Sequence, residues 1–138
     1  MPATVDGSFS IVDVRDVAKA HWLAEEKGKI GERYILCAKN ITSDWLLSTL
    51  GKIVGRKPPK IKIPVWLVIA MAPILTWVAD HITHKAPMVT PPVAKLLPYY
   101  FWFDGSKATR ELGLVYSPVE KSLEDAVIWF RKNGMIKK

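Results

Sequence analysis

The sequence predicts a single helix-rich α/β domain over residues 1–138, and three patterns lead to that prediction. Two units, each a short apolar run followed by a helical pattern, fill residues 9–55. A long apolar run covers residues 63–79, and an amphipathic helical pattern closes the chain. With 138 residues, of which 49% are hydrophobic, the chain is long enough to bury a core. Residues 1–8 precede these patterns, and we expect them to be flexible.

The first unit is FSIVDVRDVAKAHWLAEEKG, residues 9–28. Its apolar start, Phe9 to Val14, predicts a short strand. Asp13 or Asp16 then carries the short oxygen-bearing side chain that caps a helix, and Gly28 is a residue type that ends one. The two aspartates could form a catalytic carboxylate pair, but helix capping explains them more simply.

The second unit begins at GERYILCAKN, where the apolar run 34–38 predicts a buried strand. A helix is expected to begin at residues 40–42 and to end at Gly55. Cys37 lies inside the predicted strand without a neighbouring histidine, which indicates an inert buried thiol.

Residues 63–79, IPVWLVIAMAPILTWVA, are almost wholly apolar. Pro64 suits a helix start, whereas Pro73 is expected to kink or break the helix interior. A membrane span normally needs about 20 apolar residues, so this run is marginal in length. We therefore expect a helix that is buried or faces a partner, with membrane contact as the less favoured alternative.

Beyond this run, the pattern predicts a short helix over residues 92–97 and a strand over 100–103. FDGSKATRELGL, residues 103–114, predicts a turn and a short helix that stops at Gly113. SPVEKSLEDAVIWFRKNG then predicts the closing helix, which begins either at a capping box from Ser117 or near Lys121.

Composition excludes some classes of function. The basic residues behind the net charge of +7 gather mainly in GKIVGRKPPKIK and RKNGMIKK rather than along one helix interleaved with aromatic residues. We therefore expect a solvated basic loop and tail and no nucleic-acid partner. One cysteine allows no intrachain disulfide, and the start MPATVDGSFS lacks the pattern of a signal peptide. We therefore expect a cytoplasmic protein.

The search for catalytic or metal-binding groups yields isolated residues. The glycines of GKIG, residues 28–31, follow a predicted helix rather than a strand, so this stretch is a turn and not a phosphate cradle. His81 and His84 could share a metal, but no matching ligand set completes the site. His21 could act as a base, although beside Trp22 on an apolar face it is more simply a packed core histidine. No metal site is predicted.

Taken in order, several pieces resemble one family. They are VDVRDVAKAH at residues 12–21, the GERY stretch from Gly31, SKATRELG at 106–113, and the closing tryptophan-bearing helix. Together they resemble the C-terminal half of extended short-chain dehydrogenase/reductases, in particular the NAD-dependent epimerase/dehydratase group and its dihydroflavonol-reductase-like and hopanoid-associated sugar-epimerase-like members. The likeness implies the C-terminal, substrate-binding portion of an extended Rossmann-type fold, without the N-terminal glycine-rich dinucleotide-binding half.

Members of that family bind NAD or NADP through the N-terminal half, and they use a tyrosine with a lysine four residues later. The residues four positions after Tyr34, Tyr99, Tyr100 and Tyr116 are Ala38, Phe103, Asp104 and Glu120. The resemblance thus implies that the chain has no catalytic or cofactor-binding residue of its own. Its expected partners are a small-molecule substrate and either the missing N-terminal Rossmann half or a second copy. Alone, it is expected to bind no nicotinamide cofactor tightly.

The resemblance also implies where a substrate lies. Nucleotide-sugar epimerases often have an arginine at the position aligned with Phe9, where it pairs with a diphosphate, so Phe9 favours a less charged ligand. The implied substrate-binding residues on the first strand and in the later substrate loop are Phe9, Ile11, Asp13, Met88, Val89 and Pro91.

A second hypothesis comes from a different class of function. Residues 63–79 could make the chain a stand-alone interaction module, or a module peripheral to a membrane, because a large exposed apolar patch tends to recruit another chain or surface.

Overall fold

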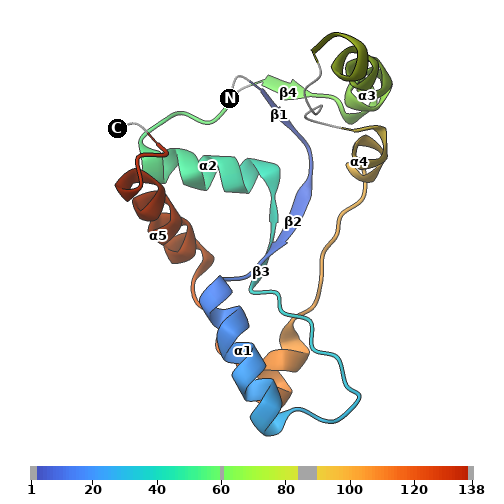
Figure 1. The fold of residues 1–138 in the computed structure, drawn as a ribbon. Helices are drawn as coiled ribbons and strands as arrows, with labels where there is room; N and C mark the ends of the chain where they lie inside the picture. The colour runs from blue at the N-terminus through green and yellow to red at the C-terminus, as the bar shows by residue number, and fades with distance from the viewer. Residues whose placement is uncertain (1–2, 60, 84–89, 137–138) are drawn as a thin grey trace.

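The computed structural model describes residues 3–59, 61–83 and 90–136. Helices predominate and the strands are few and short, so the predicted helix-rich α/β class is confirmed (Figure 1). The helical elements are α1 (Val14–Lys27), α2 (Ser43–Val54), α3 (Val65–Val78), the π-helix η1 (Ala79–Thr83), α4 (Pro91–Leu96), the π-helix η2 (Ala108–Leu112) and α5 (Val119–Lys132).

The strands form two separate pairs. β1 (Ala3–Val5) pairs in parallel with β4 (Ile61–Ile63), and β2 (Ser8–Ile11) pairs antiparallel with β3 (Lys39–Thr42). In Figure 1, β1 and β2 follow one another along a single curved arm. Much of the segment 1–8, for which we expected flexibility, therefore lies in strands.

The helix of the first β-then-α unit forms as predicted. The Asp13 carboxylate accepts a hydrogen bond of 2.8 Å from the Arg15 backbone N–H and caps α1, while Asp16 lies inside the first turn. The Gly28 N–H donates to the Ala24 carbonyl at 2.9 Å and ends the helix. The strand is shorter than the predicted Phe9 to Val14, because Asp13 already serves as the helix cap.

In the second unit the helix forms as predicted, but the strand does not. Thr42 caps α2 through the Trp45 N–H, and Gly55, with φ of 75°, ends it. The strand predicted over residues 34–38 is wrong: this segment is irregular, and β3 forms just after it. Two of its amides have single partners instead of a strand's ladder of hydrogen bonds. The Ala38 N–H donates to the Ile11 carbonyl at 2.9 Å, and the Cys37 N–H donates to the Tyr116 hydroxyl at 3.3 Å.

The main buried cluster lies where α1 packs against η2, at the lower end of the molecule in Figure 1. Leu112 and Leu114 are fully buried there. Tyr34 and Leu36 of the irregular segment pack against the same cluster, which explains the apolar character that suggested a strand. The predicted stop of the short helix is confirmed, since Gly113 adopts φ of 71°.

α3 differs from the prediction at its proline. The helix runs from Val65 to Val78 without interruption at Pro73. Among its described residues only Ala72 is buried, so α3 is not the buried helix that was one of our expectations. By length and composition alone, Val65–Ile82 is the one candidate membrane span in the described part of the chain, a weak indication because core helices pass the same criteria. The short helix expected over 92–97 is confirmed as α4.

The closing helix begins at Val119, after Pro118, and the predicted capping box is absent at this described terminus. Ser117 is engaged elsewhere: its N–H and hydroxyl donate to the buried Asp16 carboxylate at 2.7 and 2.9 Å. Glu120 instead forms an ion pair of 2.7 Å with Lys39. These two contacts join α5 to α1 and to β3.

The chain exposes an unusually large surface. A folded monomer of 15.5 kDa is expected to expose about 7,200 Å². This chain exposes 10,214 Å², and many of its large apolar side chains are part of that surface. The excess indicates that the chain, as an isolated unit, leaves apolar faces uncovered.

Candidate substrate-binding surface

An aromatic strip, residues Tyr99 to Phe103, runs between α4 and η2 alongside β2. We predicted a strand over 100–103, and this prediction is wrong, because the segment has no regular secondary structure in this described stretch. Side chains hold it instead of a backbone ladder. The Phe101 N–H donates to the Ser8 hydroxyl at 2.9 Å, and the Ser10 hydroxyl lies 2.8 Å from the Phe101 carbonyl.

Asn40 of β3 fixes the other end of the aromatic strip. Its amide nitrogen donates to the Phe103 carbonyl at 3.0 Å, and its amide oxygen accepts from the Phe103 N–H at 3.2 Å. The same oxygen lies 2.6 Å from the Ser10 hydroxyl and 3.3 Å from the Cys37 thiol. One asparagine therefore ties the strip to both strands of the β2–β3 pair.

The rings of the aromatic strip remain open to solvent. All five are between 46% and 63% exposed, and Tyr100 meets Trp102 edge to face at 5.3 Å between ring centroids. No charged residue occurs from Leu96 to Phe103. Such a surface can stack a flat apolar ring, whereas nothing in these residues favours an anionic ligand.

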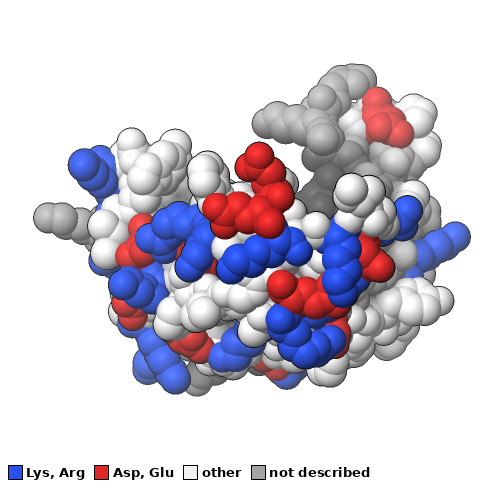
Figure 2. Space-filling view, turned by 90° about the horizontal axis from the view of Figure 1, so that it is seen from below, with Lys and Arg blue, Asp and Glu red and all other residues white. Residues whose placement is uncertain are grey.

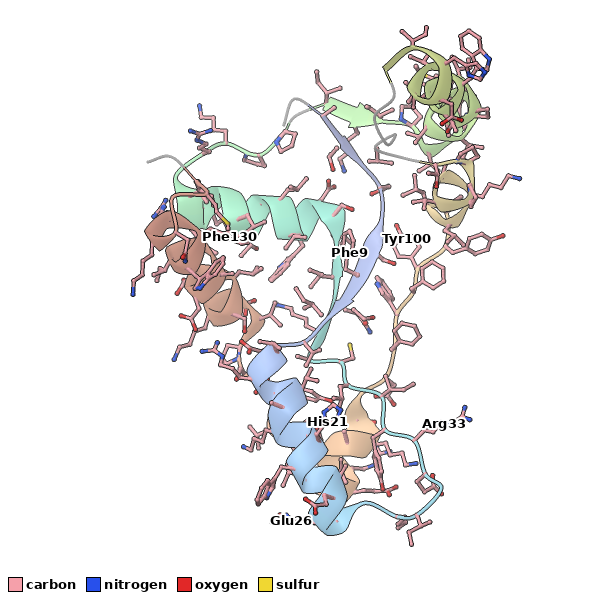
Figure 3. The ribbon with its side chains drawn as sticks, in the orientation of Figure 1. Phe9, His21, Glu26, Arg33, Tyr100 and Phe130 are labelled. Atoms are coloured by element: carbon pink, nitrogen blue, oxygen red, sulfur yellow. The ribbon has the colours of Figure 1, made fainter. Side chains whose placement is uncertain are left out.

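β2 separates the aromatic strip from Phe9. In Figure 3, Phe9 lies on the side of β2 that faces α2, and Tyr100 lies on the other side. This follows from strand alternation, because Ser8 and Ser10 point to the strip. Phe9 lines a pocket of about 200 Å³ with Leu46 and Leu47 of α2 and is 47% exposed.

The other predicted substrate-binding residues are dispersed. Ile11 and Asp13 line a pocket of about 440 Å³ between the start of α1 and α5, where Leu123 and Trp129 form its apolar wall. Pro91 begins α4, which packs against α3. Met88 and Val89 lie outside the described residues. The described part of the set thus spans two pockets and one helix start.

Asp13 is already occupied by protein partners. Its carboxylate accepts from the Arg15 side chain at 2.7 and 2.9 Å and from the Ser122 hydroxyl. These bonds, that to Arg15 first, hold the pKa of Asp13 far below its usual value, and the same pair raises the pKa of Arg15. Arg15 also bridges to Asp125 at 2.8 Å. The cluster joins α1 to α5, and its geometry is that of a structural clamp.

The described residues that were considered singly as catalytic or metal-binding candidates are not brought together in the structure. His21 is exposed rather than packed in the core, and its Nδ1 lies 2.8 Å from the Val17 carbonyl. Cys37 is buried, as predicted. His81 stacks on Trp77, and His84 lies outside the described residues. Within the described ranges, no three His, Cys, Asp or Glu side chains are grouped to hold a metal ion.

The charged side chains give no single-sign patch on the face seen in Figure 2. Lys and Arg are interspersed there with Asp and Glu. Elsewhere in the described chain, opposite charges also pair, for example Lys107 with Glu32 at 2.6 Å and Lys29 with Glu111 at 3.3 Å. A surface of both signs is typical of a solvated exterior.

The described residues do not fit a nicotinamide cofactor. A dinucleotide cradle needs a glycine-rich turn between a strand and a helix. GKIG follows α1 and leads into the irregular segment, and Gly31 adopts φ of 82° in a turn. GKIG is therefore a turn and not a dinucleotide cradle, and no step of hydride transfer is assigned to the described residues.

Comparison with known proteins gives several relatives. No protein-family profile matches the chain. The chain is 38% identical over 144 residues to a "Putative dihydroflavonol 4-reductase" of Synechocystis, covering 99% of this chain and 41% of that protein. It is 34% identical over 137 residues to "Sterol demethylase protein B" of Methylococcus capsulatus, covering 99% and 42%.

Solved structures agree. The crystal structure of gox2253 matches with a TM-score of 0.79 and 37% identity, over 99% of this chain and 41% of that one. A nucleoside-diphosphate-sugar epimerase from Pseudomonas aeruginosa matches with a TM-score of 0.76 and 25% identity, over 99% and 40%. The chain thus spans about two fifths of the length of these proteins. It resembles, over 99% of its length, the C-terminal part of longer dihydroflavonol-reductase-like and epimerase proteins, the relatives expected of an extended short-chain dehydrogenase/reductase.

Proposed function

We propose that this chain is the substrate-binding part of an NAD(P)-dependent reductase whose substrate is an uncharged molecule with apolar rings. The family in general depends on NAD(P). The names of the two relatives refer to a dihydroflavonol and a sterol, both of which are polycyclic compounds with little charge. The hydride donor would be held by a cofactor-binding part that precedes this region in the relatives.

The aromatic strip is the observation that carries the proposal. Its five rings are exposed, and its backbone is held by Ser8, Ser10 and Asn40. An exposed aromatic surface that is also fixed in place loses little conformational entropy when a ring stacks on it. The strip also has no cationic side chain that could bind a diphosphate. This agrees with the presence of Phe9 at the position where many nucleotide-sugar epimerases have an arginine.

Ligand titration of the purified chain tests this proposal. We expect a dihydroflavonol such as taxifolin to change the tryptophan fluorescence saturably, through stacking near Trp102, and uridine diphosphate glucose to have no such effect. Replacing Tyr100 by alanine should weaken taxifolin binding roughly tenfold, because it removes the ring that packs edge to face against Trp102.

Trp22→Ala is the matched control. Trp22 is 64% exposed on α1 and Trp102 is 53% exposed on the aromatic strip, so both are surface tryptophans of similar exposure. Trp22→Ala should leave taxifolin affinity unchanged, while Trp102→Ala should reduce it. Tighter binding of the nucleotide sugar than of taxifolin would overturn the proposal, and so would equal losses in the two tryptophan variants.

A further inference from the structure

α3 carries an exposed apolar stripe along one side. Four of its exposed residues follow one another at intervals of four, three and four positions, and they are Trp66, Ala70, Pro73 and Trp77. At about 100° per residue, these positions fall within an arc of about 60° on the helix surface. Alternating intervals of four and three residues are the pattern by which one helix packs along another. The stripe is therefore shaped for a single partner helix.

The other side of α3 is attached to the rest of the chain. α3 packs against α4, and Ala72 and Ala94 are both fully buried at 0% exposure. Ala72 lies roughly opposite the stripe at about 100° per residue, so the stripe points away from α4. In Figure 1, α3 lies at the edge of the molecule. This placement leaves room for a second helix against the stripe.

The stripe is self-complementary in antiparallel order. Its two ends are the large rings of Trp66 and Trp77, and its middle is formed by the short side chains of Ala70 and Pro73. A register that sets Trp66 against Trp77 of a second copy also sets Ala70 against Pro73 of that copy. A two-fold interface between identical chains has this property, because each contact then occurs twice.

Charge and dipole agree with the antiparallel order. Residues 63–79 contain no charged side chain, so the pairing of two stripes buries no charge. Asp80 is exposed just beyond the C-terminal end of α3, where its own helix dipole is unfavourable for an anion. In an antiparallel pair, Asp80 comes near the N-terminal end of the second copy's helix, where the dipole favours an anion.

We propose that α3 pairs antiparallel with α3 of a second copy of this chain, about a two-fold axis that passes midway between Ala70 and Pro73. Surface is available for this contact, because the chain exposes 10,214 Å², whereas each partner in a typical interface buries roughly 800 Å². The proposal concerns assembly and does not depend on the identity of the substrate.

Ile74 provides the test of both contact and direction. It is 60% exposed and lies on one flank of the stripe. In antiparallel order the two copies share this flank, so Ile74 of one copy lies near Ile74 of the other, whereas parallel order puts them on opposite flanks. Light scattering after size exclusion should show a dimer of the wild-type chain. Ile74→Glu should raise the dimer dissociation constant at least roughly tenfold.

An equimolar mixture of the Ile74→Glu and Ile74→Lys chains should recover the dimer, because opposite charges then face each other on the shared flank. This recovery also shows that the variants remain folded. Ile30→Glu is the matched control, since Ile30 is fully exposed in the turn after α1 and the substitution is chemically the same. It should leave the dissociation constant unchanged.

Several results would overturn the proposal. A wild-type chain that stays monomeric at micromolar concentration would do so, and if that monomer instead sediments with lipid vesicles, a membrane covers the stripe. Equal losses in Ile74→Glu and Ile30→Glu would mean that the copies meet through another face. A mixture of the Ile74→Glu and Ile74→Lys chains that stays monomeric would contradict the antiparallel contact.

Discussion

At the scale of single residues, Asp13 was predicted to bind substrate, and in the structure its hydrogen bonds go to other residues of the chain. As an N-cap it accepts from the Arg15 backbone, and its remaining lone pairs take the Arg15 guanidinium and the Ser122 hydroxyl. Its side chain is only 5% exposed. A carboxylate with this many donors links α1 to α5 and has little capacity left for a ligand.

The Asp13 clamp leads to a prediction about pH. Asp13→Asn keeps a capping oxygen but removes the charge, so it should lower the free energy of unfolding by about 1 to 2 kcal/mol near neutral pH. The pKa of Asp13 is lower in the folded chain than its unfolded value of about 3.9, so this stabilisation is complete above about pH 4 and fades as the pH falls further.

Urea unfolding of the wild type and of Asp13→Asn at neutral and acidic pH measures this effect. The difference between the two proteins should shrink as the pH falls below about 4. Asp6→Asn, which alters an exposed aspartate between β1 and β2, should change little at either pH. A difference for Asp13→Asn that stays constant with pH would mean that its charge contributes nothing.

Gly105 shows why a residue's role can be hidden in the sequence. FDGSK reads as a turn, and the turn is there, since Asp104 accepts from the Ser106 N–H at 2.8 Å. The constraint on Gly105 itself comes from a distant segment: an added Cβ would lie 2.5 Å from the Cys37 carbonyl oxygen and 2.8 Å from its nitrogen. Local patterns contain no information about such a long-range approach.

At the scale of elements, the sequence predicted helices better than strands. Capping residues and stops are local signals: Asp13 is one of the two caps proposed for its helix, Thr42 lies within the predicted start 40–42, and Gly55 and Gly113 end their helices as predicted. The capping box proposed from Ser117 is the exception. A strand needs a partner, and partners are not local. The apolar runs 34–38 and 99–103 are therefore extended or irregular segments whose backbone groups bond mainly to side chains.

The aromatic strip was missed as a site for the same reason. Its composition was visible, but the residues that fix it, Ser8, Ser10 and Asn40, lie far away in the sequence and carry no motif. The one available signal was the concentration of five aromatic residues without a charge. Of the predicted substrate-binding residues that the structure describes, which are Phe9, Ile11, Asp13 and Pro91, none contributes one of the hydrogen bonds that hold the strip.

Asn40 gives the prediction at this scale. Asn40→Ala removes both bonds to the Phe103 backbone and should lower the free energy of unfolding by about 1 to 2 kcal/mol. Hydrogen exchange at the Phe103 amide should accelerate more than the global change explains. Asn133→Ala, which removes a bond confined to the end of α5, should leave Phe103 exchange unchanged. An unaltered Phe103 amide in Asn40→Ala would show that the strip is held by other contacts.

At the scale of the whole molecule, the excess of exposed surface is the main fact to explain. It amounts to about 3,000 Å² beyond the expectation for a monomer of this mass, far more than the roughly 800 Å² that each partner buries in a typical protein interface. The apolar faces of the chain, including the aromatic strip and the walls of the α1–α5 pocket, need a cover.

We expect that cover to be a cofactor-binding part of the same polypeptide, because the relatives are more than twice as long as the region they share with this chain. An antibody raised against this chain should therefore detect, in the source cells, a polypeptide of at least about twice its size, as a preceding dinucleotide-binding domain would require. A band at the size of this chain alone would contradict that expectation. The apolar faces would then have to be covered by a separate protein or by a second copy, and the chain would function as an interaction module instead of a substrate lobe.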